Sequence, residues 1–167
     1  MRTDVKRRGW TISAEGNDLA DRFLESVFFT GNGRMGARGY PAYRPIRRPL
    51  DAGLFLAGFY DRISDSTELT DFVNLPTPIW YQIRLNGRIP AIPSHLSRAL
   101  DLRTGLLTFR YRLSIADDWV DVQEQRFFSL AKPSFLFQRL EFQGRGQVEL
   151  LAGSTTRAAT ALSQTIR

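Results

Sequence analysis

The residues from Glu25 to Tyr40 read E-S-V-F-F-T-G-N-G-R-M-G-A-R-G-Y and join an apolar run to a glycine-dense segment. Val27 to Phe29 form a β-prone run, and four glycines then fall within nine residues. Because glycine tolerates positive φ and allows other atoms close to the backbone, this spacing predicts a constrained turn. The Asn32-Gly33 pair is typical of a tight β-hairpin, so we expect Met35 to Arg38 to form the return strand.

Other strands are predicted by the order of apolar and polar residues. Ile79 to Leu85 and Leu107 to Ile115 alternate cleanly, which is typical of strands with one buried and one wet face. Gly53 to Tyr60 is almost continuously apolar, which predicts a strand covered on both faces. Several strands, short turns and no convincing long amphipathic helix together predict an all-β fold, an antiparallel β-sandwich.

The second half of the chain contains two expected interruptions of the strand pattern. In Val120 to Leu130 the period slips around Glu124 to Phe127, which predicts a β-bulge. Phe135 to Phe142 is expected to form the next strand. Gly144-Arg145-Gly146 then predicts a hairpin turn, with Val148 to Leu151 pairing behind it.

Length and composition indicate one domain, because 167 residues with 43% hydrophobic content can build a single core. We assign residues 1–153 to the sandwich and 154–167 to a tail that is either weakly structured or the start of the next strand. The chain has no cysteine, which excludes disulfides, zinc–thiolate sites and thiol nucleophiles. The single histidine, His95, lies in a proline-punctuated loop without a recognisable partner, so we expect no metal and no cofactor.

The N-terminus carries paired arginines, but polar residues follow them instead of the apolar core of a signal peptide. No apolar run reaches the roughly 18 residues of a membrane span. We therefore expect a cytoplasmic protein without a membrane partner.

The net charge of +6 raises nucleic-acid binding as a rival function. The arginines scatter along the predicted strands, and the one dense cluster, Arg44, Arg47 and Arg48, lies in a loop broken by prolines. No signature of an RNA- or DNA-binding fold is present. We expect no nucleic-acid partner, and assign the arginines to solvated faces and to an interface.

The pattern E-S-x-F-x-x-G-N-G-x-x-G-x-R-G, which begins at Glu25, resembles the opening signature of the N-terminal domain of glycoside hydrolase family 65. The resemblance covers roughly Trp10 to Ser154 and departs at Arg34, where the family usually has an aromatic residue. Further segments resemble later blocks of this domain in the same order: Gly53 to Asp61, Glu68 to Pro76, Arg98 to Leu107 and Gln125 to Leu130.

The family that this sequence resembles contains maltose, trehalose and kojibiose phosphorylases and related α-glucoside hydrolases. The resemblance implies a galactose mutarotase-like sandwich that continues beyond this region and leads into an (α/α)6 barrel with the catalytic glutamate and phosphate site. We therefore expect a sandwich that is incomplete at its C-terminal side and no catalytic residue in this chain. We also expect a homo-oligomer that covers an unpaired edge. Disaccharide and phosphate would be ligands of the parent enzyme.

Within that framework, the glycine-rich loop is expected to face the catalytic domain and to shape its entrance. A turn needed only for folding is the alternative explanation of the same residues. The candidate entrance residues are Asn32, Gly33, Gly36, Arg38 and Gly39.

Two tryptophans, Trp80 and Trp119, are candidates for stacking on sugar rings, because a flat aromatic face suits the apolar face of glucose. Packing in the core or at an interface is the alternative for both. If they bind sugar, the chain is a free-standing carbohydrate-binding module, which is the alternative function.

Overall fold

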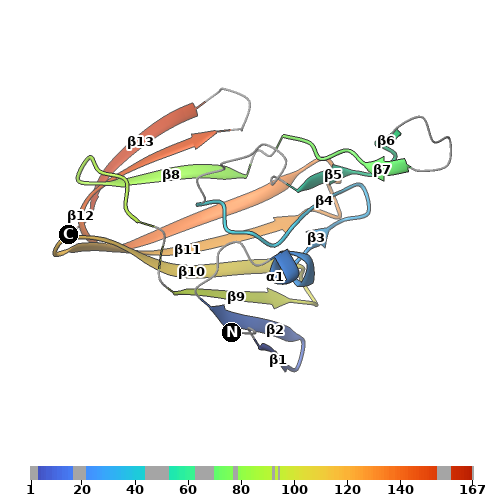
Figure 1. Cartoon of the computed structure of the whole chain (residues 1–167), viewed down its shortest axis with the longest axis horizontal. Coiled ribbons are helices and arrows are strands. Elements are labelled where there is room, and N and C mark those ends of the chain that lie inside the picture. The colour runs from blue at the N-terminus through green and yellow to red at the C-terminus, as the bar shows by residue number, and fades with distance from the viewer. Residues whose placement is uncertain are drawn as a thin grey trace.

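The computed structural model describes residues 4–16, 22–43, 53–62, 70–76, 79–91, 93, 95–153 and 159–166 (Figure 1). The regular secondary structure of these residues is almost entirely antiparallel strand. The largest sheet follows the order β1-β2-β9-β10-β11-β12-β13, and β8 also pairs with β12. Its strands are β1 (Val5–Arg8), β2 (Thr11–Gly16), β8 (Trp80–Leu85), β9 (Leu96–Asp101), β10 (Leu106–Ile115), β11 (Asp118–Phe128), β12 (Leu136–Gly153) and β13 (Ala159–Ile166). The predicted basic cluster at Arg44, Arg47 and Arg48 and residues 154–158 of the predicted tail lie outside the described residues.

The long strand β12 turns this sheet into two layers. Residues 136–145 of β12 pair with β11, whereas residues 148–153 pair with β8 on one side and β13 on the other. In Figure 1, β12 curls upward so that β8 lies above β10 and β11. Across the gap, the hydroxyl of Tyr81 on β8 is hydrogen-bonded to that of Tyr111 on β10. The predicted antiparallel β-sandwich is confirmed.

The predicted hairpin at Gly144 to Gly146 is wrong, because β12 runs through these residues without reversing. Gly144 is required where β12 pairs with the start of β11: a Cβ there would lie 2.2 Å from the carbonyl oxygen of Trp119. Gly146 has a φ of +122°, which lets the strand bend toward β8. The two glycines therefore serve a bend within one strand.

The core lies between the two layers and follows the predicted alternation. Half-buried or exposed side chains such as Gln82, Arg84 and Arg110 point away from it. The buried side chains that point into the core are Ile79, just before β8, then Tyr81, Ile83 and Leu85 on β8, and Leu107, Phe109, Tyr111 and Leu113 on β10.

The predicted bulge in β11 is also wrong. The register of β11 with β10 and with β12 is uninterrupted from Asp118 onward. Its buried side chains alternate strictly through Val120, Val122, Glu124 and Arg126. The apparent slip arises because two charged residues occupy inward positions that the sequence pattern assigned to apolar ones.

A short helix and small sheets lie at one end of the sandwich, on the right in Figure 1. They are α1 (Arg22–Val27), the sheet β3 (Thr30–Gly31), β4 (Met35–Ala37) and β5 (Leu54–Leu56), and the pair β6 (Tyr60–Arg62) and β7 (Thr70–Phe72). Among the described residues, no helix is long and apolar enough to cross a membrane.

Two strand predictions in this region need correction. Val27 ends α1 instead of beginning a strand, and the Phe28 N–H donates to the Leu24 carbonyl at 2.9 Å. Leu24 and Phe28, four residues apart, are both fully buried, so helical spacing places them on the same side. The apolar run from Gly53 to Tyr60 is likewise split by a turn at Gly58, where φ is +80°. It contributes to two different sheets.

Candidate functional site at the glycine-rich hairpin

The predicted hairpin at Asn32-Gly33 is confirmed, with β3 and β4 as its strands. The Asn32 side-chain oxygen accepts hydrogen bonds from the N–H groups of Arg34 at 3.1 Å and Met35 at 3.0 Å. Gly33 has a φ of +83°, the left-handed conformation that this turn requires. The Asn-Gly pair thus closes the turn with its own side chain.

The other half of the Asn32 amide ties the hairpin to the main sheet. Its nitrogen donates to the carbonyl oxygens of Ser129 at 2.7 Å and Pro133 at 3.0 Å, both in the connection between β11 and β12. One side chain therefore uses its acceptor locally and its two donors on segments about a hundred residues away in sequence. The hairpin tip is held in place rather than free to move.

Replacing Asn32 with alanine is expected to lower the free energy of unfolding by about 2–3 kcal/mol, because several hydrogen bonds of about 1 kcal/mol each are lost. Asn32→Asp should cost as much, since it keeps the acceptor for Arg34 and Met35 but turns a second oxygen toward two carbonyls. Urea unfolding monitored by fluorescence measures both. Arg34→Ala, an exposed neighbour, is the control and should change stability little. A loss for Asn32→Ala no larger than for the control would contradict the anchoring role.

Two further glycines of the segment are sites of close packing. A Cβ on Gly36 would lie 2.6 Å from the Phe29 ring, and one on Gly39 would lie 2.3 Å from the Phe28 Cβ. The Gly39 N–H also donates to the Glu25 carbonyl at 2.7 Å. Both glycines are buried, so their lack of a side chain serves packing against α1 and its following residues.

Arg38, the charged member of the predicted entrance loop, is half-buried and held through its backbone. Its N–H donates to the Gly53 carbonyl at 3.0 Å, and its carbonyl accepts from Arg126 Nη2 at 2.8 Å. Of the five candidate entrance residues, only Gly33 is exposed, together with its neighbour Arg34. The loop therefore has an exposed tip and a less exposed base that is held by hydrogen bonds.

Beneath this segment lies a buried ionic pair that the sequence interpretation missed. Glu124 and Arg126 are fully buried on the inward face of β11, with Nη1 and Oε1 separated by 3.5 Å. The Glu124 carboxylate accepts from the Ala42 N–H at 2.9 Å, and Arg126 donates to Arg38. The pair thus fixes both ends of the stretch from Arg38 to Ala42. If the alternation of inward and outward residues is continued strictly beyond Val122, it assigns positions 124 and 126 to the inward face. That sequence signal could have predicted the pair.

Tyrosine hydroxyls complete the environment of Glu124. Tyr81 donates to its carboxylate at 3.1 Å and shares a short hydrogen bond with Tyr111, while Tyr43 donates to the Pro90 carbonyl at 3.0 Å. Burial raises the pKa of Tyr43 to about 12. Burial, reinforced by the Glu124 charge, raises the pKa of Tyr81 and Tyr111 well above the ordinary value. The three phenols therefore remain protonated donors.

Glu124 makes the stability of the domain depend on pH. Burial raises its pKa above the ordinary value, although Arg126 and the hydrogen bonds from Ala42, Tyr81 and Gln138 oppose the rise. The folded state then binds this proton more tightly than the unfolded state. The resulting stabilisation is complete below the unfolded pKa and is lost as pH rises through the folded pKa.

We therefore expect the unfolding free energy of the wild type, measured relative to Glu124→Gln, to fall as pH rises above the ordinary glutamate pKa of 4.5. Urea titrations of both proteins between about pH 4 and pH 8 test this expectation. The glutamine variant is the control because it cannot titrate at this position. If the unfolding free energy of the wild type instead rises with pH relative to that of Glu124→Gln, the pKa of Glu124 is lowered in the folded state and the expectation is wrong.

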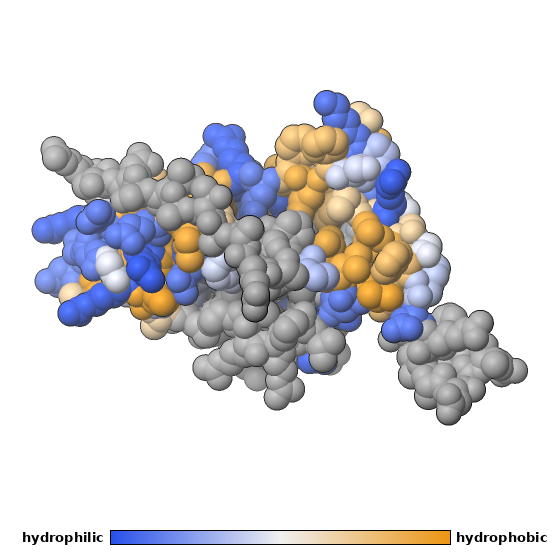
Figure 2. All heavy atoms as spheres, turned by 90° about the horizontal axis from the view of Figure 1, so that it is seen from above, coloured by the Kyte–Doolittle hydropathy of each residue, from blue (hydrophilic) through white to orange (hydrophobic). Residues whose placement is uncertain are grey.

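Exposed aromatic residues line a shallow groove of about 260 Å³ beside the hairpin. Phe29, Phe55 and Phe72 form a chain of ring contacts with centroid distances of 6.2 and 5.9 Å, and Tyr60 meets Phe72 at 5.0 Å. Phe72 and Tyr60 are more than half exposed, at 52% and 55%. Figure 2 shows apolar residues gathered on this right-hand half of the visible face. Exposed aromatic clusters of this kind mark interaction surfaces.

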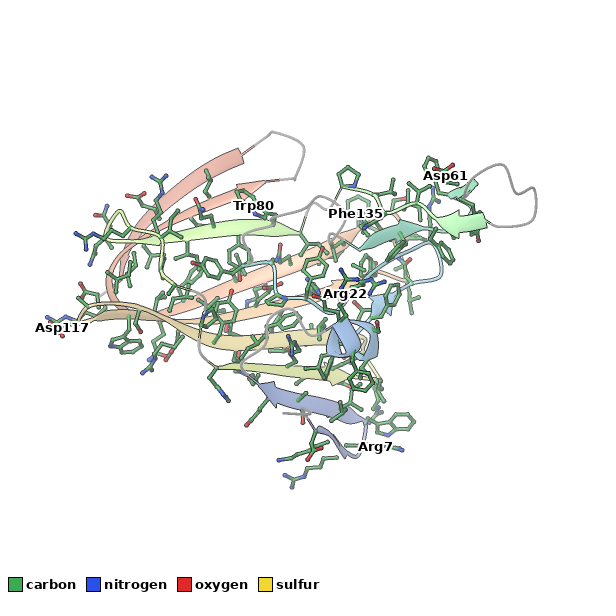
Figure 3. The ribbon with its side chains drawn as sticks, in the orientation of Figure 1. Arg7, Arg22, Asp61, Trp80, Asp117 and Phe135 are labelled. Atoms are coloured by element: carbon green, nitrogen blue, oxygen red, sulfur yellow. The ribbon has the colours of Figure 1, made fainter. Side chains whose placement is uncertain are left out.

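The two tryptophan candidates are not brought together. Trp80 begins β8, and Trp119 lies beside Asp118, which is hydrogen-bonded to Asn86 just past the far end of β8. The length of β8 therefore separates them, about 20 Å at 3.3 Å per residue. Trp80 is labelled on the upper side of the molecule in Figure 3. Both are half-buried, and the Arg112 guanidinium lies 4.1 Å from the Trp119 ring centre.

No group of three or more residues able to ligate a metal occurs among the residues that the structure describes. His95 is exposed on the approach to β9.

Comparison with known proteins agrees with this architecture. The family described as "Glycosyl hydrolase family 65, N-terminal domain" matches residues 14–160. The chain therefore belongs to glycosyl hydrolase family 65, and the match is to that family's N-terminal domain. The resemblance seen in the sequence is confirmed.

The chain spans only a small part of the length of two relatives that it matches. It is 26% identical to the trehalose 6-phosphate phosphorylase of Lactococcus lactis subsp. lactis (strain IL1403), covering 67% of this chain and 16% of the relative. A solved structure described as a kojibiose phosphorylase from human microbiome has a TM-score of 0.74 at 16% identity. That match covers 89% of this chain and 22% of the solved chain, and it supports the fold.

Proposed function

We propose that this chain is the non-catalytic N-terminal domain of a family 65 enzyme that cleaves α-glucosidic disaccharides by phosphorolysis or hydrolysis. In this proposal the hairpin end supports an (α/α)6 catalytic barrel and shapes its entrance. The observation that carries the proposal is the anchored hairpin. Its tip is exposed, its base is fixed by Glu124 and Arg126, and exposed aromatic rings flank it.

The Asn32 side chain links the hairpin to the connection between β11 and β12, and exposed apolar side chains lie near both segments. Besides the groove at β5 to β7, the connection it binds and the start of β12 carry Leu130, Phe135 and Phe137, which are exposed at 81%, 52% and 44%. Such a concentration of exposed apolar side chains favours a large protein interface over a solvated surface. Because the chain belongs to family 65, we take the catalytic barrel as the partner at this interface.

Glu124, the carboxyl group with the most elaborate surroundings, is unsuited to act on a sugar. Its side chain is fully buried and already accepts hydrogen bonds from Ala42, Tyr81 and Gln138. Glycoside cleavage requires a carboxylic acid that reaches the leaving oxygen. The catalytic glutamate therefore belongs to the barrel in this proposal.

An activity assay of the chain alone, of a separately produced family 65 barrel and of their mixture tests the proposal. Maltose, trehalose and kojibiose are supplied with and without phosphate, and glucose 1-phosphate and glucose are measured. We expect no turnover by the chain alone and higher turnover by the mixture than by the barrel. Cleavage by the chain alone would overturn the non-catalytic role, and a barrel indifferent to the chain would overturn the supporting role.

Without the barrel, the aromatic end is expected to make the chain self-associate. Light scattering should then show a dimer or larger species, and addition of the barrel should convert it into a heteromeric complex. A strictly monomeric chain at about 100 μM would contradict this part of the proposal, because interfaces of typical affinity are populated at that concentration.

A further inference from the structure

A groove of about 620 Å³ lies on the outer face of the main sheet and is lined mainly by polar residues, with Tyr111, Val122 and Phe142 also contributing to its lining. We call it the outer-face groove; its outward side chains come from the approach to β9 and from β9 to β12. They form two rows across the strands, set by the register of the sheet. The first row is Ser97, Arg110, Gln123 and Glu141, and the second is Arg112, Asp121 and Gln143. With strands about 4.8 Å apart, the first row crosses four strands and is about 14 Å long, and the second crosses three and is about 10 Å long.

The first row is preorganised by hydrogen bonds that run from strand to strand. Arg110 Nε donates to Gln123 Oε1 at 2.7 Å, and Gln123 Nε2 donates to Glu141 Oε2 at 2.9 Å. Gln123 is therefore the central member, with one amide atom committed to each neighbour. The Arg110 Nη atoms make no hydrogen bond to the described residues and remain available as donors.

The second row contains one ordered ion pair and remains accessible. Arg112 and Asp121 form a bidentate pair with both contacts at 2.6 Å, although their side chains are 56% and 44% exposed. The Gln143 amide makes no hydrogen bond within the described part of the chain. The groove thus offers planar groups, held in fixed positions, that can donate to and accept from a ligand.

The charges in the groove balance, since Arg110 and Arg112 face Asp121 and Glu141. Two carboxylates would repel a phosphate-rich ligand. A peptide strand would need an open edge, but β9, β10 and β11 are each paired on both sides. Hydroxyl groups both donate and accept, so a neutral polyhydroxylated ligand matches the groove best.

We propose that the outer-face groove binds a neutral oligosaccharide, at a site separate from the hairpin end. The ligand lies along the two rows, and Gln123 is the central contact. This function goes beyond support of the barrel. It would hold an oligosaccharide on the domain surface without cleaving it.

Isothermal titration calorimetry of the full chain with maltoheptaose, cellohexaose and xylohexaose tests the proposal, together with amide NMR shifts. We expect saturable binding of at least one of them and shifts centred on β10 to β12. Gln123→Ala should weaken that binding by about tenfold or more, the effect of losing a central polar contact. Gln125→Ala is the matched control, because Gln125 lies on the same face of β11 but does not line the groove.

Three results would overturn the proposal. These are no saturable binding of any of the three sugars at about 10 mM, equal effects of the two substitutions, or NMR shifts confined to the hairpin end. Circular dichroism and thermal unfolding of both variants establish that they are folded. Gln123→Ala should leave association with the barrel unchanged. The experiment can therefore refute oligosaccharide binding at the groove without refuting support of the barrel, and the reverse.

Discussion

Arg126→Met is expected to destabilise the domain by about 3–5 kcal/mol, because it removes one partner of a buried ion pair and leaves the Glu124 carboxylate without its cation. The guanidinium also lies between the rings of Tyr40 and Phe109, with centroid distances of 5.2 and 5.1 Å. Its loss also removes one of the two hydrogen bonds that the Arg38 carbonyl accepts at the base of the hairpin, and leaves the one from the Tyr40 N–H. Chemical denaturation followed by tryptophan fluorescence measures the effect.

Two further variants separate the buried charge from the loss of an arginine in general. Arg139→Met removes a guanidinium from the exposed Arg139–Glu141 pair on the neighbouring strand and should change stability little. The double variant Glu124→Leu, Arg126→Met should be more stable than Arg126→Met alone, since no uncompensated charge remains. Equal losses for Arg126→Met and Arg139→Met would refute the structural role of the buried pair.

Gly39→Ala is expected to cost about 3 kcal/mol, at the upper end of the range for added atoms in a packed site. The new methyl group would lie 2.3 Å from the Phe28 Cβ and 2.5 Å from the Phe28 carbonyl oxygen. Neither atom is the end of a flexible side chain, so the backbone after α1 or the hairpin base must move. Thermal and urea unfolding should both report the loss.

Gly33→Ala provides the matched comparison within the same segment. No atom lies within 4 Å of a Cβ added at Gly33, so its cost comes only from the positive φ, about 1–2 kcal/mol. We therefore expect Gly39→Ala to be clearly the more damaging of the two. If the two substitutions cost the same, close packing is not the reason for a glycine at position 39.

The regular parts of the fold were predictable because their side chains obey a simple period. In β8 and β10 every second residue is apolar and buried, so the alternation alone identified strand and inward face. The Asn32-Gly33 hairpin was predictable for a local reason, because that pair suits a turn whose conformation few other residues adopt.

The errors arose where tertiary packing overrides local pattern. Glu124 and Arg126 point inward because Ala42, Arg38 and two aromatic rings surround them, and nothing in the neighbouring sequence reports those partners. Gly144 resembled a turn residue, although its small size is needed where β12 pairs with the start of β11. In each case the deciding atoms come from distant segments of the chain.

The candidate site was predictable only in part. The glycine spacing indicated Asn32 as a turn residue, but its two donors reach Ser129 and Pro133, which sequence spacing cannot place. The aromatic groove was missed, because Phe29, Tyr60 and Phe72 come from three separate segments. The entrance role of this end remains a proposal.

Hydrogen exchange of the chain with and without a family 65 barrel tests that role most directly. We expect the barrel to slow exchange in peptides covering the hairpin from Thr30 to Ala37 and strands β5 and β6. Peptides from the outer-face groove, around Gln123 and Glu141, should be unchanged and serve as the internal control. Unchanged exchange at the hairpin, with slowing at the outer face instead, would contradict the proposed orientation.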